Sequence, residues 1–282
     1  MEKKRKIAVA ISSHSAPPFT LMTVGSLIRE CGDNSDLNIH IGVHSNIDDS
    51  TSDFSLFDET RKVAHIHQVD EIDWIAHDND VYRYSKMHAK NLENILKHIR
   101  FYDFEYLLIL DNDLLIKRDF ITELLEKYPE SDLIGHYFLN SREPNTVTEQ
   151  YAGETVQMMP KCSVWCTLVS RKLFDRIIAD TSLIYPEKVS DYQRKVDLTN
   201  FYPTVDPNIN VVFDTFSKIL LIENEGWKFT MLHEDEIIGD THHFTASSFN
   251  YGYRQGGIDR KVESAWEMYR KEFPTGLTEL KI

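Results

Sequence analysis

One apolar run constrains the fold of this chain more than any other feature of the sequence. Residues 104–110 (FEYLLIL) are apolar along most of their length, and Asp111, Asn112 and Asp113 follow directly. Such a run predicts a strand that is buried on both faces, as in a parallel sheet covered by helices. Ligands bind at the carboxyl ends of the strands in sheets of this kind. The sequence therefore predicts an α/β protein whose polar groups gather at one edge of a central sheet.

Shorter segments on both sides of this strand repeat the alternation of strand and helix. Their apolar spacing predicts strands over residues 7–11, 37–43, 63–69, 163–169 and 227–232, and helices over residues 19–28, 85–99, 172–179, 211–222 and 261–271. Repeated strand–helix units favour a mostly parallel sheet flanked by helices. Residues 140–160 are polar and without a period, which predicts a flap, and residues 180–207 are predicted to be irregular.

Composition and charge limit the kinds of protein that this chain can be. Its 282 residues are 41% hydrophobic and 27% charged, which excludes collagen, a coiled coil and wholesale disorder. The net charge of −14 argues against nucleic acid or an anionic membrane as the main partner. No run approaches the ~18 apolar residues of a membrane span. The apolar run at residues 7–11 is too short for a signal peptide, so we expect a cytoplasmic protein.

The three cysteines, Cys31, Cys162 and Cys166, are an odd and sparse set. This usage predicts a reducing compartment and no disulfide framework. Cys162 and Cys166 have the spacing of half a zinc site, but no second pair of ligands follows. We expect them to be structural and to share one face of a strand.

The segment after the central strand carries the clearest chemical signal. Asp111 and Asp113 are two carboxylates separated by one residue, and carboxylate oxygens are the ligands that Mg²⁺ and Mn²⁺ prefer. Such ions keep coordination positions for the phosphates of a substrate. The alternative is an ordinary turn at the end of a strand, where Asp and Asn are common.

Residues 106–120 (YLLILDNDLLIKRDF) resemble the DXD segment of GT-A glycosyltransferases, closest to the family 2-type group. Further segments resemble elements of that family in the same order: residues 7–15, 47–53, 84–98, 161–177, 210–232 and 241–248. The resemblance covers most of residues 5–250 and implies a GT-A fold, which is Rossmann-like. It implies a single domain over residues 1–282, with a nucleotide-sugar-binding half (1–115), an acceptor-binding half (116–250) and a C-terminal helical extension (251–282).

The resemblance also implies an activity. A family member of this kind moves a sugar from a UDP-, GDP- or dTDP-linked donor to a hydroxyl of a glycan or glycoconjugate, with Mn²⁺ or Mg²⁺ as cofactor. The implied metal ligands are Asp111, Asp113, His243 and His242. The implied donor-binding residues are Ser12, Ser13, His14, Asp48, Asp49, Lys86, Lys90, Asp111 and Asn112.

Asp214 is the candidate general base of an inverting reaction, because that reaction must remove a proton from the acceptor hydroxyl. Its alternative role is to complement the dipole of the helix predicted over residues 211–222, in whose first turn it lies. Asp206, Asp191 and Glu234 are weaker alternatives for the base. Trp165 is a candidate for stacking on an acceptor sugar, against an ordinary packing role. The chain departs from the family in carrying a lone Asp214 where many relatives have two adjacent acids. The Gln-x-x-Arg-Trp element of processive members is absent, which argues against a polysaccharide synthase.

Other classes of protein share parts of this pattern. Residues 107–115 (LLILDNDLL) also resemble the motif of haloacid-dehalogenase-like phosphatases, but that motif lies on the first strand, whereas three predicted strands precede it here. A sugar-nucleotide pyrophosphorylase would show a Gly-rich basic loop, which residues 11–19 (ISSHSAPPF) lack. A non-catalytic module that binds a nucleotide or a sugar remains a further alternative, and a turnover assay separates it from an enzyme.

Overall fold

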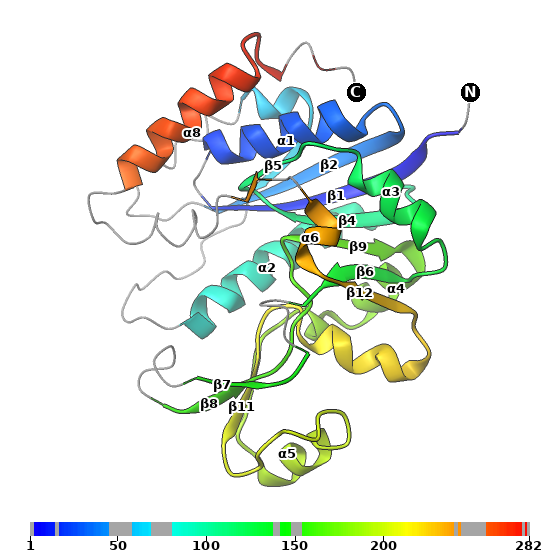
Figure 1. Ribbon diagram of the computed structural model, residues 1–282, viewed down its shortest axis with the longest axis vertical. Coiled ribbons are helices and arrows are strands. Elements are labelled where there is room, and N and C mark those ends of the chain that lie inside the picture. The colour runs from blue at the N-terminus through cyan, green and yellow to red at the C-terminus, as the bar shows by residue number, and fades with distance from the viewer. Residues whose placement is uncertain are drawn as a thin grey trace.

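The fold is built on one large sheet. The computed structural model describes residues 3–14, 17–44, 58–68, 81–137, 142–147, 154–239, 242–243, 258–277 and 280. Seven strands pair in the order β12-β6-β9-β4-β1-β2-β3 (Figure 1). Their bounds are β1 (Arg5–His14), β2 (Ser35–His44), β3 (His65–Gln68), β4 (Tyr106–Asp111), β6 (Leu133–His136), β9 (Cys166–Ser170) and β12 (Phe229–Leu232). Only β9 runs antiparallel to its neighbours in this sheet, which confirms the predicted α/β class.

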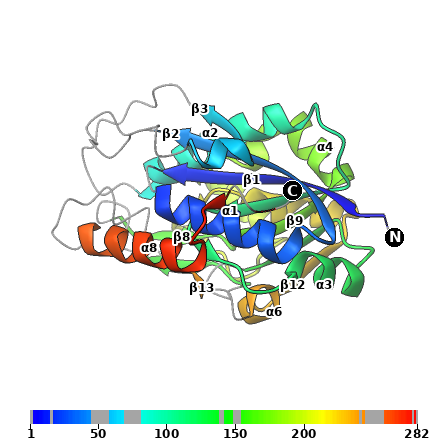
Figure 2. The same cartoon turned by 90° about the horizontal axis from the view of Figure 1, so that it is seen from above.

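Helices cover both faces of the sheet (Figure 2). One face carries α1 (Pro17–Cys31), α3 (Phe120–Lys127) and α8 (Ile258–Glu272), and the other carries α2 (Val81–Ile99) and α4 (Arg171–Ala179). Successive side chains of β1 point to opposite faces of the sheet and so contribute to the hydrophobic core on each side. Val9 and Ile11 pack with the first group of helices, and Ala8 and Ala10 pack with the second. Helices α1, α2, α4 and α8 and six of the seven strands thus lie where the sequence predicts them, whereas α3 and β6 are not predicted.

A smaller sheet of four strands lies toward the bottom of Figure 1. It consists of β10 (Glu187–Val189), β11 (Asn210–Phe213), β8 (Val156–Met158) and β7 (Asn145–Val147), with α5 (Tyr192–Leu198) after β10. The flap predicted over residues 140–160 is therefore wrong where the chain is described, since β7 and β8 lie in it. The irregular segment predicted over 180–207 contains β10 and α5. Strands of three residues are too short to show an alternation in the sequence.

The helix predicted over residues 211–222 is also wrong. Val211, Val212 and Phe213 are at most 2% exposed and lie in β11, and a 3-10 helix, η5 (Lys218–Glu225), follows. A short apolar run fits a strand that is buried on both faces as well as it fits a helical stripe. Asp214 therefore follows a strand, and it does not lie in the first turn of a helix.

The three cysteines are free and buried. Cys162 and Cys166 do not share a face, because Cys162 packs with α2 and α4 whereas Cys166 packs with α1 and α3. The strand begins only at Cys166, and Cys162 forms an isolated bridge with Tyr137. Burial raises the pKa of the Cys162 thiol to about 12 and that of Cys166 above its usual range. Both thiols are therefore protonated at neutral pH, and neither belongs to a group of three or more metal-ligating side chains among the described residues.

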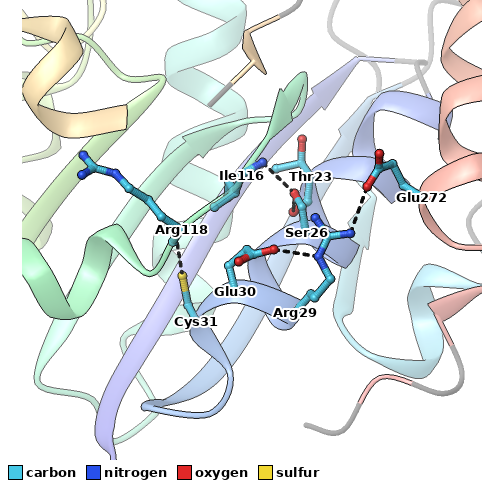
Figure 3. A network of polar contacts seen from close by, with 8 residues as sticks. All are labelled: Thr23, Ser26, Arg29, Glu30, Cys31, Ile116, Arg118 and Glu272. Carbon is cyan, nitrogen blue, oxygen red and sulfur yellow. Dashed lines mark hydrogen bonds and ion pairs between the residues drawn. The ribbon is translucent and has the colours of Figure 1, made fainter. Parts of the chain in front are cut away.

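The residues that follow α8 pack against α1 at Gly25. A Cβ atom at this position would lie 2.7 Å from Leu277 Cδ2 and 2.8 Å from Phe273 Cζ, so a larger residue would displace these two side chains. Arg29 of α1 pairs with Glu272 of α8 at 3.1 Å (Figure 3).

Among the described residues, we find no helix with the length and apolar character needed to cross a membrane.

Candidate active site

Two polar segments meet at the carboxyl edge of the large sheet. Ser12 of β1 is in register with Asp111 at the end of β4, as strand pairing predicts. Asp111 is half-buried, and Asp113 is only 4% exposed. Polar groups therefore do gather at this edge of the sheet, as the sequence predicts, for Ser12 and Asp111.

A row of hydroxyl groups on α1 holds the segment that carries the two aspartates. Thr23 Oγ1 accepts a hydrogen bond from the Leu114 amide and donates one to the Leu114 carbonyl, both at 2.9 Å. One turn later, Ser26 Oγ accepts a hydrogen bond from the Ile116 amide at 3.0 Å (Figure 3). Both hydroxyl side chains are 0% exposed. Because polar groups this deeply buried are costly to leave unpaired, the row fixes the backbone that follows Asp113.

Ser13 and Asn112 are part of the same buried network. Asn112 Nδ2 donates hydrogen bonds to Ser13 Oγ at 3.3 Å and to Thr20 Oγ1 at 3.1 Å, and the two hydroxyl oxygens are 2.8 Å apart. Ser13 is 0% exposed and Asn112 is 3% exposed. Their observed contacts join β1, α1 and β4, and their donor-binding role stays a prediction.

Helix α2 reaches the same edge through Asn91. Its Nδ2 donates to Ser12 Oγ at 2.8 Å and to the Gly42 carbonyl at 3.0 Å. A Cβ atom at Gly42 would collide with Asn91 Oδ1 and lie 2.8 Å from Ile95 Cδ1. Glycine at this position in β2 is therefore what lets α2 approach the strand ends.

The structure describes some, but not all, of the other residues predicted to bind the sugar donor or the metal. Lys86 and Lys90 are exposed, one turn apart on α2. Asp48 and Asp49 lie outside the described residues. For His14, His242 and His243 only the backbone is described, and His243 of β13 (His242–His243) pairs with Leu114 of β5 (Leu114–Leu115). Strand pairing thus brings the histidine backbone beside the residue that follows Asp113.

Asp111 and Asp113 supply some, but not all, of the ligands that a divalent cation needs. Asp111 and Asp113 supply the hard oxygen ligands that Mn²⁺ and Mg²⁺ take, and such ions bind through one or two carboxylates plus substrate phosphates. Within the described parts of the chain, no three His, Cys, Asp or Glu side chains form a metal-binding group. The two carboxylates therefore fit an ion that completes its coordination with water and a substrate.

Asp214 lies in a second polar centre. Lys161 Nζ donates to Asp214 Oδ2 at 2.6 Å, and the Thr215 amide donates to Oδ1 at 2.7 Å. Burial by itself would raise the pKa of Asp214, but the charge and hydrogen bond of Lys161, with bonds from Ser85 and Thr215, lower it. The carboxylate is therefore ionised at neutral pH although it is 9% exposed.

The turn after Asp214 is strained. Phe216 has φ 65, and no other non-glycine residue in the described chain has a positive φ. This left-handed conformation is unfavourable for a side chain with a Cβ, and it persists where the surroundings fix it. Phe216 is 0% exposed, and its amide donates to the Ile184 carbonyl at 3.1 Å. Strain of this kind clusters at functional sites.

His88 of α2 faces the same centre. Burial, and after it the nearby charge of Lys161, lowers the pKa of His88 to about 4, while Asp214 opposes the shift. The imidazole is therefore neutral at pH 7. It offers the centre a polar group without adding a second positive charge.

Helix α2 links the two centres. Thr215 Oγ1 donates to the Ser85 carbonyl at 2.7 Å, and Asn91 contacts Ser12, which is in register with Asp111. Ser85 precedes Asn91 by six residues, which is about 9 Å along a helix. One helix thus contacts both acidic centres.

Trp165, the candidate for stacking on an acceptor sugar, is buried. It is 5% exposed, and its indole packs edge-on against His136 with ring centroids 4.2 Å apart. The ring packs in the interior with α1 and α3, so a packing role is observed, and stacking of Trp165 on an acceptor sugar stays a prediction.

The sequence patterns do not single out Lys161, His88 or Ser85. They lie far from Asp214 in the chain, and no local period joins them to it. A usable signal does exist for α1, where Thr20, Thr23 and Ser26 recur at a spacing of three in an otherwise apolar helix. A polar stripe in a buried helix indicates that a polar segment packs against it.

No protein-family model and no curated protein sequence matches this chain. Solved structures of glycosyltransferases are similar to it. The mannosyltransferase PcManGT from Pyrobaculum calidifontis, in complex with GDP-Man and Mn²⁺, is 11% identical with a TM-score of 0.46, over 100% of this chain and 77% of that chain. The galactosyltransferase LgtC, in complex with donor and acceptor sugar analogs, is 10% identical with a TM-score of 0.43. The similarity covers 94% of this chain and 95% of LgtC.

Residues 1–349 of S. aureus TarS are 10% identical with a TM-score of 0.45, over 98% of this chain and 76% of that chain. These three TM-scores lie below 0.5, so no residue of this chain takes a role from them. The chemistry of the site has to follow from its own side chains.

Proposed function

We propose that this chain is a metal-dependent glycosyltransferase that moves a sugar from a nucleoside-diphosphate donor to a hydroxyl of a glycan or glycoconjugate, with inversion. One observation carries the proposal: α2 contacts both acidic segments, through Asn91 at Ser12, which is in register with Asp111, and through Ser85 at Thr215, which follows the buried, ionised Asp214. Transfer with inversion needs two such acidic centres, one for the departing diphosphate and one for the acceptor hydroxyl.

Asp111 and Asp113 are the residues that would hold Mn²⁺ or Mg²⁺, with His242 or His243 as further ligands. When bound, such an ion supplies Lewis-acid neutralisation of the charge on the departing diphosphate. The exposed Lys86 and Lys90 add positive charge on the same helix that contacts the sheet edge. Ser12, Ser13, His14, Asp48, Asp49 and Asn112 complete the proposed donor side.

Asp214 is the proposed base. In the transfer step the acceptor oxygen forms a bond to the anomeric carbon, and the bond from that carbon to the diphosphate oxygen breaks. The leaving nucleoside diphosphate takes the electron pair, and the acceptor proton passes to Asp214. A weakly basic carboxylate suffices, because the hydroxyl becomes acidic once its oxygen has begun to form the new bond.

Nucleotide-dependent stabilisation tests the donor side. We would measure unfolding temperatures with UDP, GDP, dTDP and CMP, each with Mn²⁺ or with EDTA. A ligand at about 100 times its Kd adds about 2.7 kcal/mol, which corresponds to several degrees for a chain of this size. One diphosphate is expected to stabilise the protein only when Mn²⁺ is present, and Asp113→Asn is expected to remove that effect.

Two variants separate binding from transfer. Asp214→Asn is expected to keep the nucleotide shift and lose transfer, and full transfer by this variant would exclude Asp214 as the base. Asp175→Asn, which removes an exposed carboxylate paired with Arg171 at 2.9 Å, serves as the control and keeps both properties. A folded protein that no nucleotide stabilises would contradict the proposal.

A further inference from the structure

The ion pair between Lys161 and Asp214 is buried more deeply than any other pair in the described chain. Its side chains are 16% and 11% exposed, and the two atoms are 2.6 Å apart. A pair removed from water loses hydration on both charges, so removing one partner leaves the other uncompensated. Lys161 has no part in the transfer step described above, and its position beside the proposed base calls for a separate role.

We infer that Lys161 is a positioning residue that keeps the Asp214 carboxylate ionised and fixed in one orientation, so that the site works at mildly acidic pH. The inference rests on the proposed function, since it takes Asp214 to be the group that meets the acceptor. Lys161 itself acts through Asp214 and does not contact the substrate.

The charges around Asp214 support this role. Lys161 comes from the segment between β8 and β9, and Ser85 and His88 come from α2. Among the charged and titratable groups that face the carboxylate, Lys161 lowers the pKa of Asp214 through its charge and its hydrogen bond, whereas the buried His88 is neutral at pH 7. Without Lys161, burial would dominate and would favour the protonated, inactive form of Asp214.

The hydrogen bonds around Asp214 support a fixed orientation. Lys161 bonds Oδ2, the Thr215 amide bonds Oδ1, and Ser85 supplies a third bond to the carboxylate. A carboxylate offers about four acceptor positions, so one remains for an acceptor hydroxyl. The strained turn at Phe216 and the bond from Thr215 to Ser85 hold the backbone that carries this carboxylate.

The test compares Lys161→Met and Lys161→Arg with a matched control. Lys218→Met removes another largely buried lysine, 3.2 Å from Glu187 and near the small sheet, whose pair does not include Asp214. We would measure kcat/KM for transfer from pH 5 to 9. Lys161→Met is expected to move the acid limb of the profile upward by about one pH unit or more, because an opposite charge at this distance shifts a carboxylate pKa by that amount. Lys161→Arg restores the profile toward wild type, and Lys218→Met leaves it in place.

A second measurement does not depend on activity. Relative to wild type, the free energy of unfolding of Lys161→Met is expected to fall as pH rises from 4 to 7, since the folded variant then holds Asp214 with a raised pKa. The double variant Lys161→Met/Asp214→Asn lacks this group, so its difference from wild type is expected to depend less on pH. An unchanged acid limb, or parallel stability curves, would overturn the inference. If the wild type binds no nucleotide and transfers no sugar, the proposed function fails, and the stability curves still decide whether Lys161 keeps Asp214 ionised.

Discussion

Acidification between pH 7.5 and 5.0 is expected to destabilise the protein through a cluster of histidines. His40 of β2 is 0% exposed, and its Nδ1 lies 2.9 Å from His67 Nε2 of β3. The rings of His65 and His98 stack against this pair with centroids 4.8 and 4.2 Å away. Burial, followed by the neighbouring histidines, lowers the pKa of His40 to about 3 and that of His67 to about 4. Both rings are therefore neutral in the folded protein.

The size of the effect follows from linkage. A histidine in the unfolded chain has a pKa of about 6.5, so the unfolded state binds more protons than the folded state below that pH. The stability contributed by each neutral ring is present above pH 6.5 and is lost as pH falls toward the folded pKa. By pH 5 the loss is about 2 kcal/mol for each ring and at most about 4 kcal/mol for the pair, because His67 keeps some contact with water. This is a large part of the roughly 5–15 kcal/mol by which domains are stable.

Urea unfolding at several pH values measures this loss. The double variant His40→Gln/His67→Gln is expected to lose less free energy of unfolding than wild type between pH 7.5 and 5.0, whatever its stability at pH 7.5. A wild type whose stability changes by less than about 1 kcal/mol over this range would refute the reasoning, as would a double variant with the wild-type slope.

Two further substitutions test the packing that supports the site. Gly42→Ala places a Cβ against Asn91 Oδ1 and is expected to cost about 1–3 kcal/mol in urea unfolding, as overpacking does; an unchanged midpoint would contradict the close approach of α2. Thr23→Val removes both bonds to Leu114 and is expected to cost about 1–3 kcal/mol and weaken Mn²⁺-dependent nucleotide binding. Thr23→Ser keeps the hydroxyl and serves as its control, so equal losses in the two variants would exclude the hydrogen bonds as the cause.

Local patterns in the sequence predict the part of the fold that builds the large sheet. The apolar run before Asp111 and the helical stripe of α2 are each long enough to show a period, and both lie where the pattern places them. The strands of the smaller sheet are not predicted, because β7, β8 and β10 have three residues each. These strands form by pairing with one another, and a short stretch of sequence carries no information about that pairing.

The same contrast explains what could be foreseen of the candidate site. Asp111 and Asp113 follow a recognisable strand, so their place at the sheet edge can be derived from the sequence. Asp214 can be singled out, but its surroundings cannot, because Lys161 precedes it by 53 residues and meets it only through the small sheet. A carboxylate that looks like the first acid of a helix in the sequence is therefore a buried ion pair at the end of a strand.

The dependence of both acidic centres on α2 has a mechanical consequence. The apolar side of α2, with Leu92, Ile95 and Leu96 all 0% exposed, fixes the helix on the sheet. The same helix places Asn91 at Ser12 and Ser85 at Thr215. A shift of α2 that leaves the helix intact must therefore move one centre relative to the other. Gly42→Ala should for this reason impair sugar transfer more than nucleotide binding, because binding uses one centre whereas transfer needs the spacing of both.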